Sequence, residues 1–414
     1  MNISKIVNHI QDLELECHLY GDDILSRVWK SIRTNIYYSL QQDLDIFAAV
    51  KPRNSFKNKL VTIYLVLVNS VFRRPKILAS HKQLVIQHPR TKKKGGLGID
   101  PYSFKFTRDI AASSLFLSRS SLGEKNKKLL ADSASMDCLL ISKMLKRHKV
   151  GGNEVEKANN LMAKLCNNLG VEASRYQKKF VTAISDFLVE EAYFSKLLTN
   201  TNIETVYLVD HYSKNVALIS ACKKLDVRVV EFQHGIISKY HLGYSVIKPE
   251  LNWACYPDLF LAWGEHWVNN TELPKSVDIS YISPAYLNEK IDVEKKNQLV
   301  IVSQSVIGKQ IAGFVVDHID VSAFDTLIFK LHPSEVDLLP YYQKVFENSP
   351  INVSVEDIYP LLNESKCVLG VFSTVMLEAV DFACDVFYID LPGSEYIQSN
   401  SMIKDVKKEP FYVG

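Results

Sequence analysis

The residues best suited to chemistry gather at the ends of apolar segments that have the pattern of β-strands. In the last third of the chain, three such segments (298–302, 326–330 and 367–372) end in polar side chains. The residues at these ends are Ser303, Gln304, Ser305, Lys330, His332, Pro333, Ser373 and Thr374. Because ligands bind at the carboxyl ends of parallel strands, where loops and helix N-termini meet, we expect these ends to converge on one ligand.

The chemistry expected at these ends is phosphate binding. Ser373 and Thr374 stand where a strand should turn into a helix, so their hydroxyls and the first N–H groups of that helix can bind an anion. Glu378, one turn further on, is placed to accept hydrogen bonds from a ribose. The structural alternative is that Ser373 is only an N-cap and Glu378 only its solvent-facing neighbour. Pro333 holds the backbone of His332 extended and so fixes the direction of the imidazole.

A second group of ionisable residues follows two strand-like segments in the middle of the chain. Asp210 and His211 come after TVYLV, and Glu231 and His234 come after VRVV. Group transfer needs a carboxylate or imidazole that removes a proton or attacks an electrophilic carbon, and Asp210, His234 and Glu231 are the candidates. Gly235 lets the backbone after His234 turn tightly or approach a ligand closely. The structural alternative for His234 is a hydrogen bond to a neighbouring backbone carbonyl.

A third set of residues is expected to bind a second substrate. An arginine at the end of the first strand could hold a carboxylate or phosphate with two parallel hydrogen bonds, and a plain surface loop is the alternative. The members of this set are His88, Arg90, His211, Lys239 and Tyr240.

The elements that must position these residues follow an α/β pattern. Apolar spacing predicts helices over residues 1–80 and mainly helix over 120–200, with a strand at 83–89 between them. From 204 onward, short apolar runs alternate with helices, which predicts parallel sheets. We expect two Rossmann-like domains facing a cleft: 1–290 with a helical elaboration, and 295–395. Residues 396–414 are expected to form a tail that packs back across the cleft.

Charge and composition limit the class of protein. Of the 414 residues, 47% are hydrophobic and 23% charged, as in globular proteins. Residues 1–150 hold 26 Lys and Arg against 12 Asp and Glu, which suggests an anionic partner such as the inner face of a membrane or a charged glycan. These basic clusters carry no motif for reading nucleic acid, so none is expected as a partner. The apolar run Leu60–Phe72 is too short to span a bilayer and contains Asn69, which predicts a buried helix.

Cysteine usage and the N-terminus indicate a cytoplasmic protein without a metal or cofactor. The seven cysteines are scattered and form no CxxC pair, which argues against a disulfide framework and a zinc site. Asp43 and Asp45 have DxD spacing, but they belong to a segment expected to be a solvated helix face. The first residues lack the apolar core and cleavage site of a secretion signal.

The motifs at the last three strand ends resemble those of known enzymes. Lys330-x-His332-Pro333 followed by Ser373-Thr374-x-x-x-Glu378 is similar to the HP and Ser-Ser/Thr motifs of bacterial sialyltransferases and polysialyltransferases. A wider resemblance includes capsule and O-antigen transferases that use CMP-3-deoxy-manno-octulosonic acid (Kdo). The stretch DIYPLLNESKCVLGVFSTVMLEA also resembles CDP-glycerol glycerophosphotransferases. The likeness covers roughly residues 300–395 and, with less specificity, 205–265.

This resemblance implies a GT-B glycosyltransferase that uses a CMP-sugar donor without a metal. His332 would contact the cytidine or its phosphate, and Ser373 and Thr374 would hold the phosphate. The transferred group would be Kdo, sialic acid or a related nonulosonic acid, and the acceptor would be a bacterial capsule, O-antigen or lipooligosaccharide. Three alternatives stay open: a polyol-phosphate transferase using CDP-glycerol, a UDP-sugar epimerase, and a non-catalytic nucleotide-binding component of a polysaccharide assembly complex.

Overall fold

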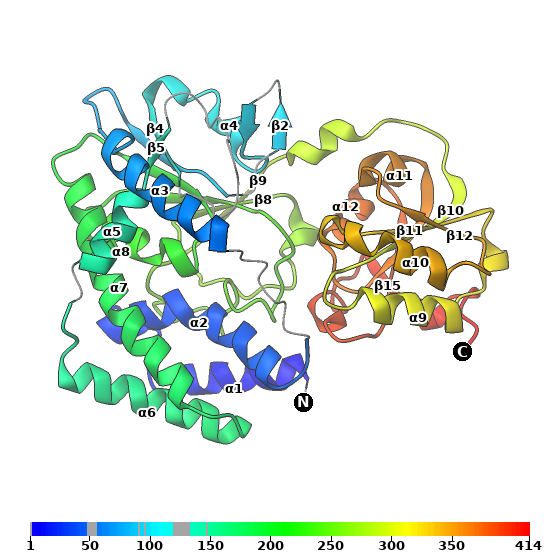
Figure 1. The fold of residues 1–414 in the computed structure, drawn as a ribbon, viewed down its shortest axis with the longest axis horizontal. Coiled ribbons are helices and arrows are strands. Elements are labelled where there is room, and N and C mark those ends of the chain that lie inside the picture. The colour runs from blue at the N-terminus through cyan, green and yellow to red at the C-terminus, as the bar shows by residue number, and fades with distance from the viewer. Residues whose placement is uncertain (1, 48–55, 90–91, 95–96, 119–132, 146–147) are drawn as a thin grey trace.

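Two domains, each built on a parallel sheet, lie side by side in the computed structural model (Figure 1). The structure describes residues 2–47, 56–89, 92–94, 97–118, 133–145 and 148–414. No helix among these residues combines the length and the apolar character needed to cross a bilayer.

The first domain contains a seven-stranded sheet with the order β5-β4-β1-β6-β7-β8-β9, and all its pairings are parallel. The chain winds outward from β1 in one direction and from β6 in the other, which is the strand order of a Rossmann domain. The point where the winding reverses therefore lies between β1 and β6. The strands are β1 (Gln83–Ile86), β4 (Ser114–Ser118), β5 (Ala134–Ser135), β6 (Thr205–Val209), β7 (Arg228–Phe232), β8 (Leu259–Ala262) and β9 (Asp278–Tyr281).

Helices around this sheet form the elaboration that the apolar spacing predicts. They are α1 (Ile3–Glu16), α2 (Ile24–Asp43), α3 (Phe56–Phe72), α4 (Phe104–Thr107), α5 (Asp137–Leu145), α6 (Gly152–Leu169), α7 (Ser174–Leu198) and α8 (Val216–Lys224), with a hairpin of β2 (Lys92–Lys94) and β3 (Leu97–Ile99). The carboxylate of Asp23 caps α2 by accepting from the backbone N–H groups of Leu25 and Ser26. Helix α2 packs on α7 and α8, and apolar side chains of these helices join those of the sheet in one core.

The second domain contains a six-stranded parallel sheet with the order β12-β11-β10-β13-β14-β15. This is again Rossmann order, with the reversal between β10 and β13. The elements are β10 (Lys296–Val302), β11 (Thr326–Lys330), β12 (Ile351–Ser354), β13 (Ser365–Gly370), β14 (Asp385–Tyr388), β15 (Ile403–Asp405), α9 (Gly308–His318), α10 (Leu339–Val345), α11 (Ile358–Glu364) and α12 (Thr374–Asp381).

The structure corrects the prediction of a tail after residue 395. Strand β15 pairs with β14, so the second domain continues through the segment that we expected to lie outside it. At three residues, β15 is too short for an alternating pattern to reveal it. The same segment also contacts the first domain: the Tyr396 and Tyr37 hydroxyls are 2.7 Å apart, and Asn400 Nδ2 donates to the carbonyl of His266 at 2.8 Å.

The prediction that Leu60–Phe72 forms a buried helix was right about the helix and wrong about its burial. The segment is helical, within α3, but several of its large apolar side chains face solvent: Ile63, Tyr64, Leu67, Val71 and Phe72 are 54–81% exposed. Apolar composition alone does not decide burial, because a helix is buried only where the tertiary fold supplies a facing surface.

Candidate functional site

The carboxyl ends of the two sheets meet between the domains. His88 follows β1 and Asp210 follows β6 at the reversal of the first sheet, while Ser303 follows β10 and Ser373 follows β13 at the reversal of the second. The loop after β7 comes close to the start of α12: a Cβ atom placed on Gly235 would lie 3.5 Å from Thr374 Oγ1. Residue 235 of the first domain, which follows His234 in the chain, is thus next to the expected phosphate-binding turn of the second.

The candidate catalytic residues of the first domain lie together around His88. The His88 ring stacks on the His234 ring with centroids 5.9 Å apart, and His88 Nε2 lies 3.9 Å from Asp210 Oδ2. Asp210 has a φ of 59°, a left-handed conformation that costs energy for a residue other than glycine. Asn215 Nδ2 holds it there by donating to its carbonyl at 2.8 Å and to its carboxylate at 3.0 Å. Asp210 and His234, two of the predicted catalytic residues, therefore both lie against His88.

Two tyrosines hold the His234 imidazole. The hydroxyl of Tyr244 lies 3.2 Å from His234 Nδ1, and the hydroxyl of Tyr212 lies 3.3 Å from Nε2. Tyr244 is fully buried and donates its single proton to Glu231 Oε1 at 2.9 Å. Since a hydroxyl has one proton to donate, the Tyr244 oxygen must accept from His234, which puts the imidazole proton on Nδ1. Nε2 is then the basic nitrogen.

Behind Tyr244 runs a buried chain of polar groups. Glu231 Oε2 lies 2.6 Å from His211 Nδ1, and His211 Nε2 lies 3.1 Å from Lys30 Nζ. Lys30 Nζ also donates to the carbonyl of Gly243 at 2.8 Å and lies 3.4 Å from the ring centroid of Tyr256. Burial raises the pKa of Glu231 to about 8, and it lowers the pKa values of Lys30 and His211 well below their usual range.

Several proton distributions satisfy this chain, and two of them differ in the charges of Lys30 and Glu231. In the first, charged Lys30 donates to His211 Nε2, and His211 Nδ1 donates to the Glu231 carboxylate. In the second, protonated Glu231 donates from Oε2 to His211 Nδ1, and neutral Lys30 accepts from Nε2. Oε1 of Glu231 is an acceptor in both cases, so Tyr244 donates to it in both. The Nδ1–H tautomer of His234 is therefore the same in both distributions.

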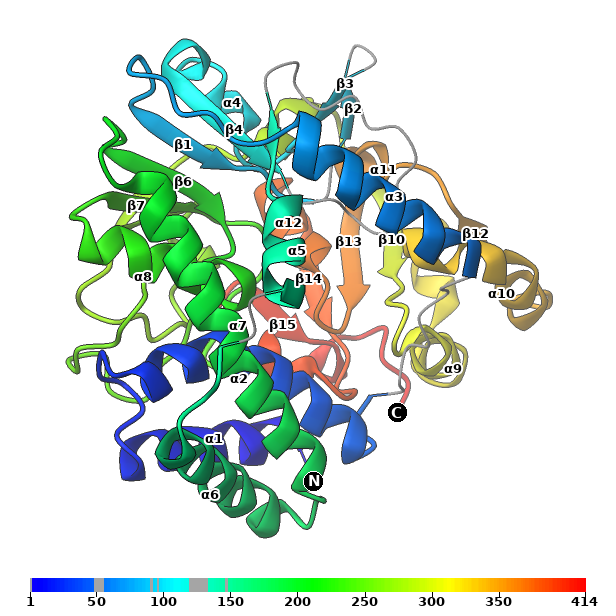
Figure 2. The same ribbon diagram turned by 60° about the vertical axis from the view of Figure 1, so that its left-hand side comes forward.

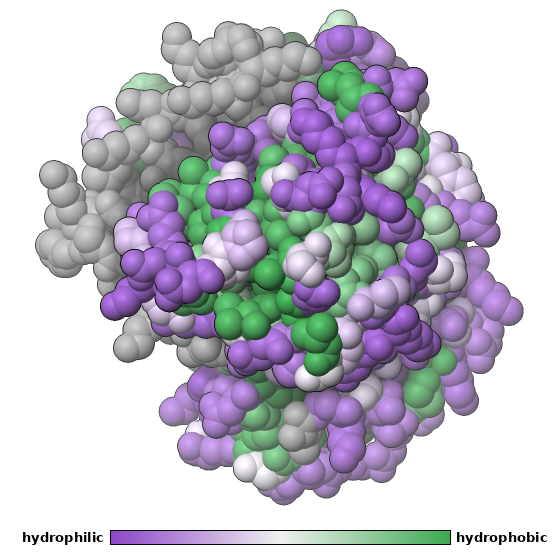
Figure 3. Space-filling view, turned by 90° about the vertical axis from the view of Figure 1, so that its right-hand side faces the viewer, coloured by the Kyte–Doolittle hydropathy of each residue, from purple (hydrophilic) through white to green (hydrophobic). Residues whose placement is uncertain are grey.

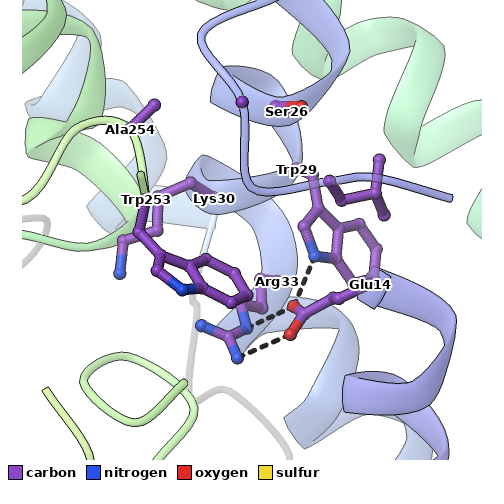
Figure 4. A pocket seen from close by; sticks show the side chains of 9 residues that line it. Glu14, Ser26, Trp29, Lys30, Arg33, Trp253 and Ala254 are labelled. Carbon is purple, nitrogen blue, oxygen red and sulfur yellow. Dashed lines mark hydrogen bonds and ion pairs between the residues drawn. The ribbon is translucent and has the colours of Figure 1, made fainter. Parts of the chain in front are cut away.

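An ion pair under α2 fixes the position of Lys30 (Figure 4). The Glu14 carboxylate forms an ion pair with Arg33 Nε at 2.6 Å, and it accepts from Arg33 Nη2 at 2.9 Å and from Trp29 Nε1 at 2.6 Å; all three side chains are buried. Arg33 also donates to the carbonyl of Ser245 at 3.0 Å. Because these bonds join α1, α2 and the loop before β8, they hold Lys30 at the carboxyl edge of the sheet.

Two predicted contact residues are buried. His211 was expected to bind the acceptor and Glu231 to act in catalysis, but both side chains are 0% exposed. Neither offers a surface to a substrate in this structure, and both contribute through the hydrogen bonds that orient His234. Lys30 and Tyr244, which contact His211 and Glu231, were absent from the predicted catalytic and binding residues. A lysine in an amphipathic helix carries no sequence signal for a partner 181 positions away.

The remaining expected acceptor residues are more dispersed. Arg90 lies outside the described residues. Lys239 is exposed, with Nζ 5.1 Å from the ring centroid of Tyr240. An aromatic residue takes their place near the histidines: Tyr102 lies edge-on to His88, with centroids 5.0 Å apart.

In the second domain, Ser373 and His332 both cap helical turns. Ser373 Oγ accepts from the backbone N–H of Val375 at 3.4 Å, so it is the N-cap of α12. His332 Nδ1 accepts from the backbone N–H of Ser334 at 3.2 Å, at the start of the 3₁₀ helix Pro333–Leu338. This bond leaves the proton of neutral His332 on Nε2, and the side chain is exposed. Ser373 keeps its own hydroxyl proton when it accepts from Val375, and it can donate that proton to an anion.

A buried carboxylate joins the ends of β10 and β11. Glu335 accepts from Ser303 Oγ at 2.8 Å, from Tyr342 at 2.7 Å and from the backbone N–H of His332 at 3.3 Å. A methyl group on Gly308, the first residue of α9, would overlap atoms of Glu335, Tyr342 and Ser303, so only glycine fits there. Glu335 thus brings together the strand ends whose convergence the sequence predicted.

The other predicted donor residues differ in accessibility. Gln304 is buried, and its side-chain oxygen accepts from the backbone N–H of Phe372 at 3.0 Å, which links the ends of β10 and β13. Lys330 is buried, and its Nζ donates to the carbonyl of Leu331 at 2.6 Å. Glu378 is 9% exposed and is hydrogen-bonded to Tyr359, while Ser305 is exposed.

Within the described part of the chain, no group of three or more His, Cys, Asp or Glu side chains could hold a metal ion. Asp43 ends α2, accepts from Tyr176 at 2.6 Å and pairs with Arg175 at 3.2 Å. These partners give Asp43 a structural role.

Comparison with known proteins finds no matching family model and no matching curated protein. Among solved structures, MurG from Acinetobacter baumannii is similar, with a TM-score of 0.38, 12% identity, and coverage of 76% of this chain and 82% of that one. UDP-GlcNAc 2-epimerase from Neisseria meningitidis, bound to UDP-GlcNAc, is similar with a TM-score of 0.39 and 10% identity, and the match covers 78% of this chain and 86% of that one. The wall teichoic acid polymerase TagF, soaked with CDPG, is similar with a TM-score of 0.34 and 10% identity, and the match covers 82% of this chain and 79% of that one.

All three TM-scores are below 0.5, so these likenesses carry no argument about activity. The fold class follows from the chain's own sheets. Two parallel sheets of seven and six strands, both in Rossmann order and meeting at their carboxyl edges, define a GT-B architecture, as the sequence predicted.

Proposed function

We propose that this chain is a glycosyltransferase that moves an acidic sugar from a CMP-sugar to a bacterial surface glycan in the cytoplasm. The sugar is Kdo, sialic acid or a related nonulosonic acid, and the glycan is a capsule, O-antigen or lipooligosaccharide. The observation that carries the proposal is the approach of Gly235, the residue after His234, to Thr374 at the start of α12. That all seven cysteines are free thiols supports the cytoplasmic location.

The second domain binds the donor in this proposal. The hydroxyls of Ser373 and Thr374 and the first N–H groups of α12 hold the single phosphate of CMP, aided by the helix dipole. The exposed Nε2–H of His332 donates to the cytidine or its phosphate. A single phosphate in the leaving group needs no metal to neutralise it, so none is part of the proposal.

The first domain activates the acceptor. His234 Nε2 removes the proton from an acceptor hydroxyl as its oxygen attacks the anomeric carbon. The bond between that carbon and the phosphate oxygen breaks, and CMP leaves with the electron pair. Tyr244 and Glu231 behind His234 keep Nε2 as the basic nitrogen, on the side of the ring where the Tyr212 hydroxyl lies. Proton transfer to such a base contributes a factor of about 10² to 10⁴ in rate. This route inverts the anomeric carbon, whereas attack by Asp210 would lead to retention.

The test is an incubation with CMP-Kdo, CMP-sialic acid and CDP-glycerol in the presence of acceptor glycans. We expect CMP release and glycan transfer only with a CMP-sugar, and an inverted product by NMR. His234→Gln should abolish transfer but preserve the thermal shift caused by CMP, since His234 lies outside the donor domain. His332→Ala with Ser373→Ala should lose that shift.

Ser322→Ala is the matched control for the donor variants, because Ser322 is an exposed serine of the second domain whose hydroxyl donates to Asp320 at 2.7 Å, away from the carboxyl ends of the strands. Release of CMP from CDP-glycerol alone would replace the proposal with polyol-phosphate transfer. Nucleotide binding without turnover of any donor would replace it with a non-catalytic component of an assembly complex, and conversion of a UDP-sugar without an acceptor would replace it with an epimerase.

A further inference from the structure

Two helices that pack on each other expose large apolar side chains on the outside of the first domain. On α3, Ile63, Leu67 and Val71 recur at intervals of four residues and are 57%, 54% and 67% exposed. On α5, Met144 and Leu145 are 80% and 79% exposed. Helix α3 lies on the outside of the molecule in the views of Figures 1 and 2. We call this the α3–α5 surface.

The α3–α5 surface is held in place from its inner side. Asn69 Nδ2 of α3 donates to the Asp137 carboxylate at the start of α5 at 2.8 Å, and Asp137 is buried. Lys143 of α5 pairs with Asp186 and Glu190 of α7. These polar contacts fix the two helices to the protein, so the exposed apolar stripe on α3 is a stable feature of the fold.

Within these two helices and the residues just after them, the charged side chains that the structure describes are basic, apart from the buried Asp137. Segments 56–78 and 138–150 contain five and four Lys or Arg residues, respectively, and no Asp or Glu. Of these, Arg74, Lys76 and Lys149 are exposed in the structure. Apolar side chains flanked by cations match the interface of an anionic bilayer, where the apolar groups enter the headgroup region and the cations meet lipid phosphates.

We propose that the α3–α5 surface docks the protein on an anionic lipid membrane. A second copy of the chain fits this surface poorly, because a symmetric contact would bring its cations against their own copies. At 17 residues, α3 lies along the interface in this proposal and does not cross the bilayer. The proposal does not depend on the transfer reaction.

Cosedimentation with vesicles tests the proposal. We expect the protein to bind vesicles of phosphatidylcholine and phosphatidylglycerol in equal parts, not to bind phosphatidylcholine alone, and to lose binding as salt is raised. Arg74→Gln with Lys76→Gln should weaken binding by about fivefold per charge removed. Leu67→Ser, Val71→Ser and Met144→Ser together should weaken it at least as strongly, because serine removes the apolar groups that enter the bilayer.

The matched control changes Val316, Met402 and Val413 of the second domain to serine; these are 52%, 50% and 57% exposed. Figure 3 shows the second-domain side of the molecule, where hydrophobic side chains gather near the middle of the face and hydrophilic ones surround them. Because this control leaves the α3–α5 surface unaltered, it should bind vesicles like the unaltered protein. The proposal is wrong if the unaltered protein ignores the anionic vesicles, or if the two triple variants bind equally well. It is also wrong if light scattering shows a dimer that only the first triple variant dissociates. Because the vesicles carry no nucleotide or acceptor, a failed transfer assay leaves this result standing.

Discussion

Replacing Tyr244 with phenylalanine tests whether a buried hydroxyl orients the proposed base. The change removes the 2.9 Å bond to Glu231 Oε1 and the 3.2 Å contact with His234 Nδ1 and leaves the ring in place. Without this hydroxyl, buried Glu231 and His234 each lose a hydrogen-bond partner, so we expect the free energy of unfolding to fall by about 1–3 kcal/mol. Without the Tyr244 oxygen as acceptor, His234 is no longer held as the Nδ1–H tautomer.

The direct measurement is ¹⁵N NMR of labelled histidine, with the His234 signals assigned by their loss in His234→Gln. The unaltered protein should show a protonated Nδ1 and a basic Nε2, and Tyr244→Phe should shift His234 toward a mixture of tautomers. In the transfer assay, kcat should fall by about a hundredfold while the KM for the donor stays constant, as expected when only proton transfer is impaired.

Tyr342→Phe is the matched control for this experiment. Tyr342 is also buried and also donates to a buried glutamate, Glu335, at 2.7 Å, but it lies in the second domain. The control should lose similar stability and leave the His234 signals unchanged. An unchanged His234 tautomer together with an unchanged kcat in Tyr244→Phe would refute the reasoning.

Three further predictions concern positions where the structure leaves little freedom. Gly235→Ala should preserve transfer, since its Cβ would make an ordinary contact with Thr374 Oγ1 at 3.5 Å, whereas Gly235→Val should push the domains apart and lower kcat/KM in the same assay. Gly308→Ala should destabilise the second domain in urea unfolding, because the new methyl overlaps three side chains, while Gly313→Ala in the same helix meets nothing within 4 Å and should stabilise it by about 0.5–1 kcal/mol. Burial lowers the pKa of His241 to about 4, below the value of about 6.5 in the unfolded chain. Between these two pH values the unfolded chain binds a proton that the folded protein does not. The free energy of unfolding should therefore be constant above about pH 6.5 and fall by at most about 1.4 kcal/mol per pH unit toward pH 4. Urea unfolding from pH 7 to 4 checks this, and His241→Asn should flatten the slope; equal slopes would contradict it.

Much of the architecture could be predicted because parallel strands and their following loops leave a local pattern. The apolar run before Asp210 and the one before Ser303 both proved to be central strands whose ends lie at a reversal of strand order. Strand β12 was missed because it has only four residues and just one of them, Ile351, is buried. Short edge strands lack the burial that creates an alternating pattern.

The residue types and the strand-end positions of the site were fixed by the sequence: a histidine before a glycine at one sheet, and serine and threonine before a helix at the other. Their accessibility was decided only by the tertiary structure. His211 and Glu231 have the same kind of sequence setting as His234, yet packing of α2 against the sheet buries both and brings Lys30 beside them. A local pattern records which side chains leave a strand end, whereas burial depends on which distant segment covers that end. For the same reason, the sequence showed that α3 is apolar, and only the fold showed that its apolar stripe is left uncovered.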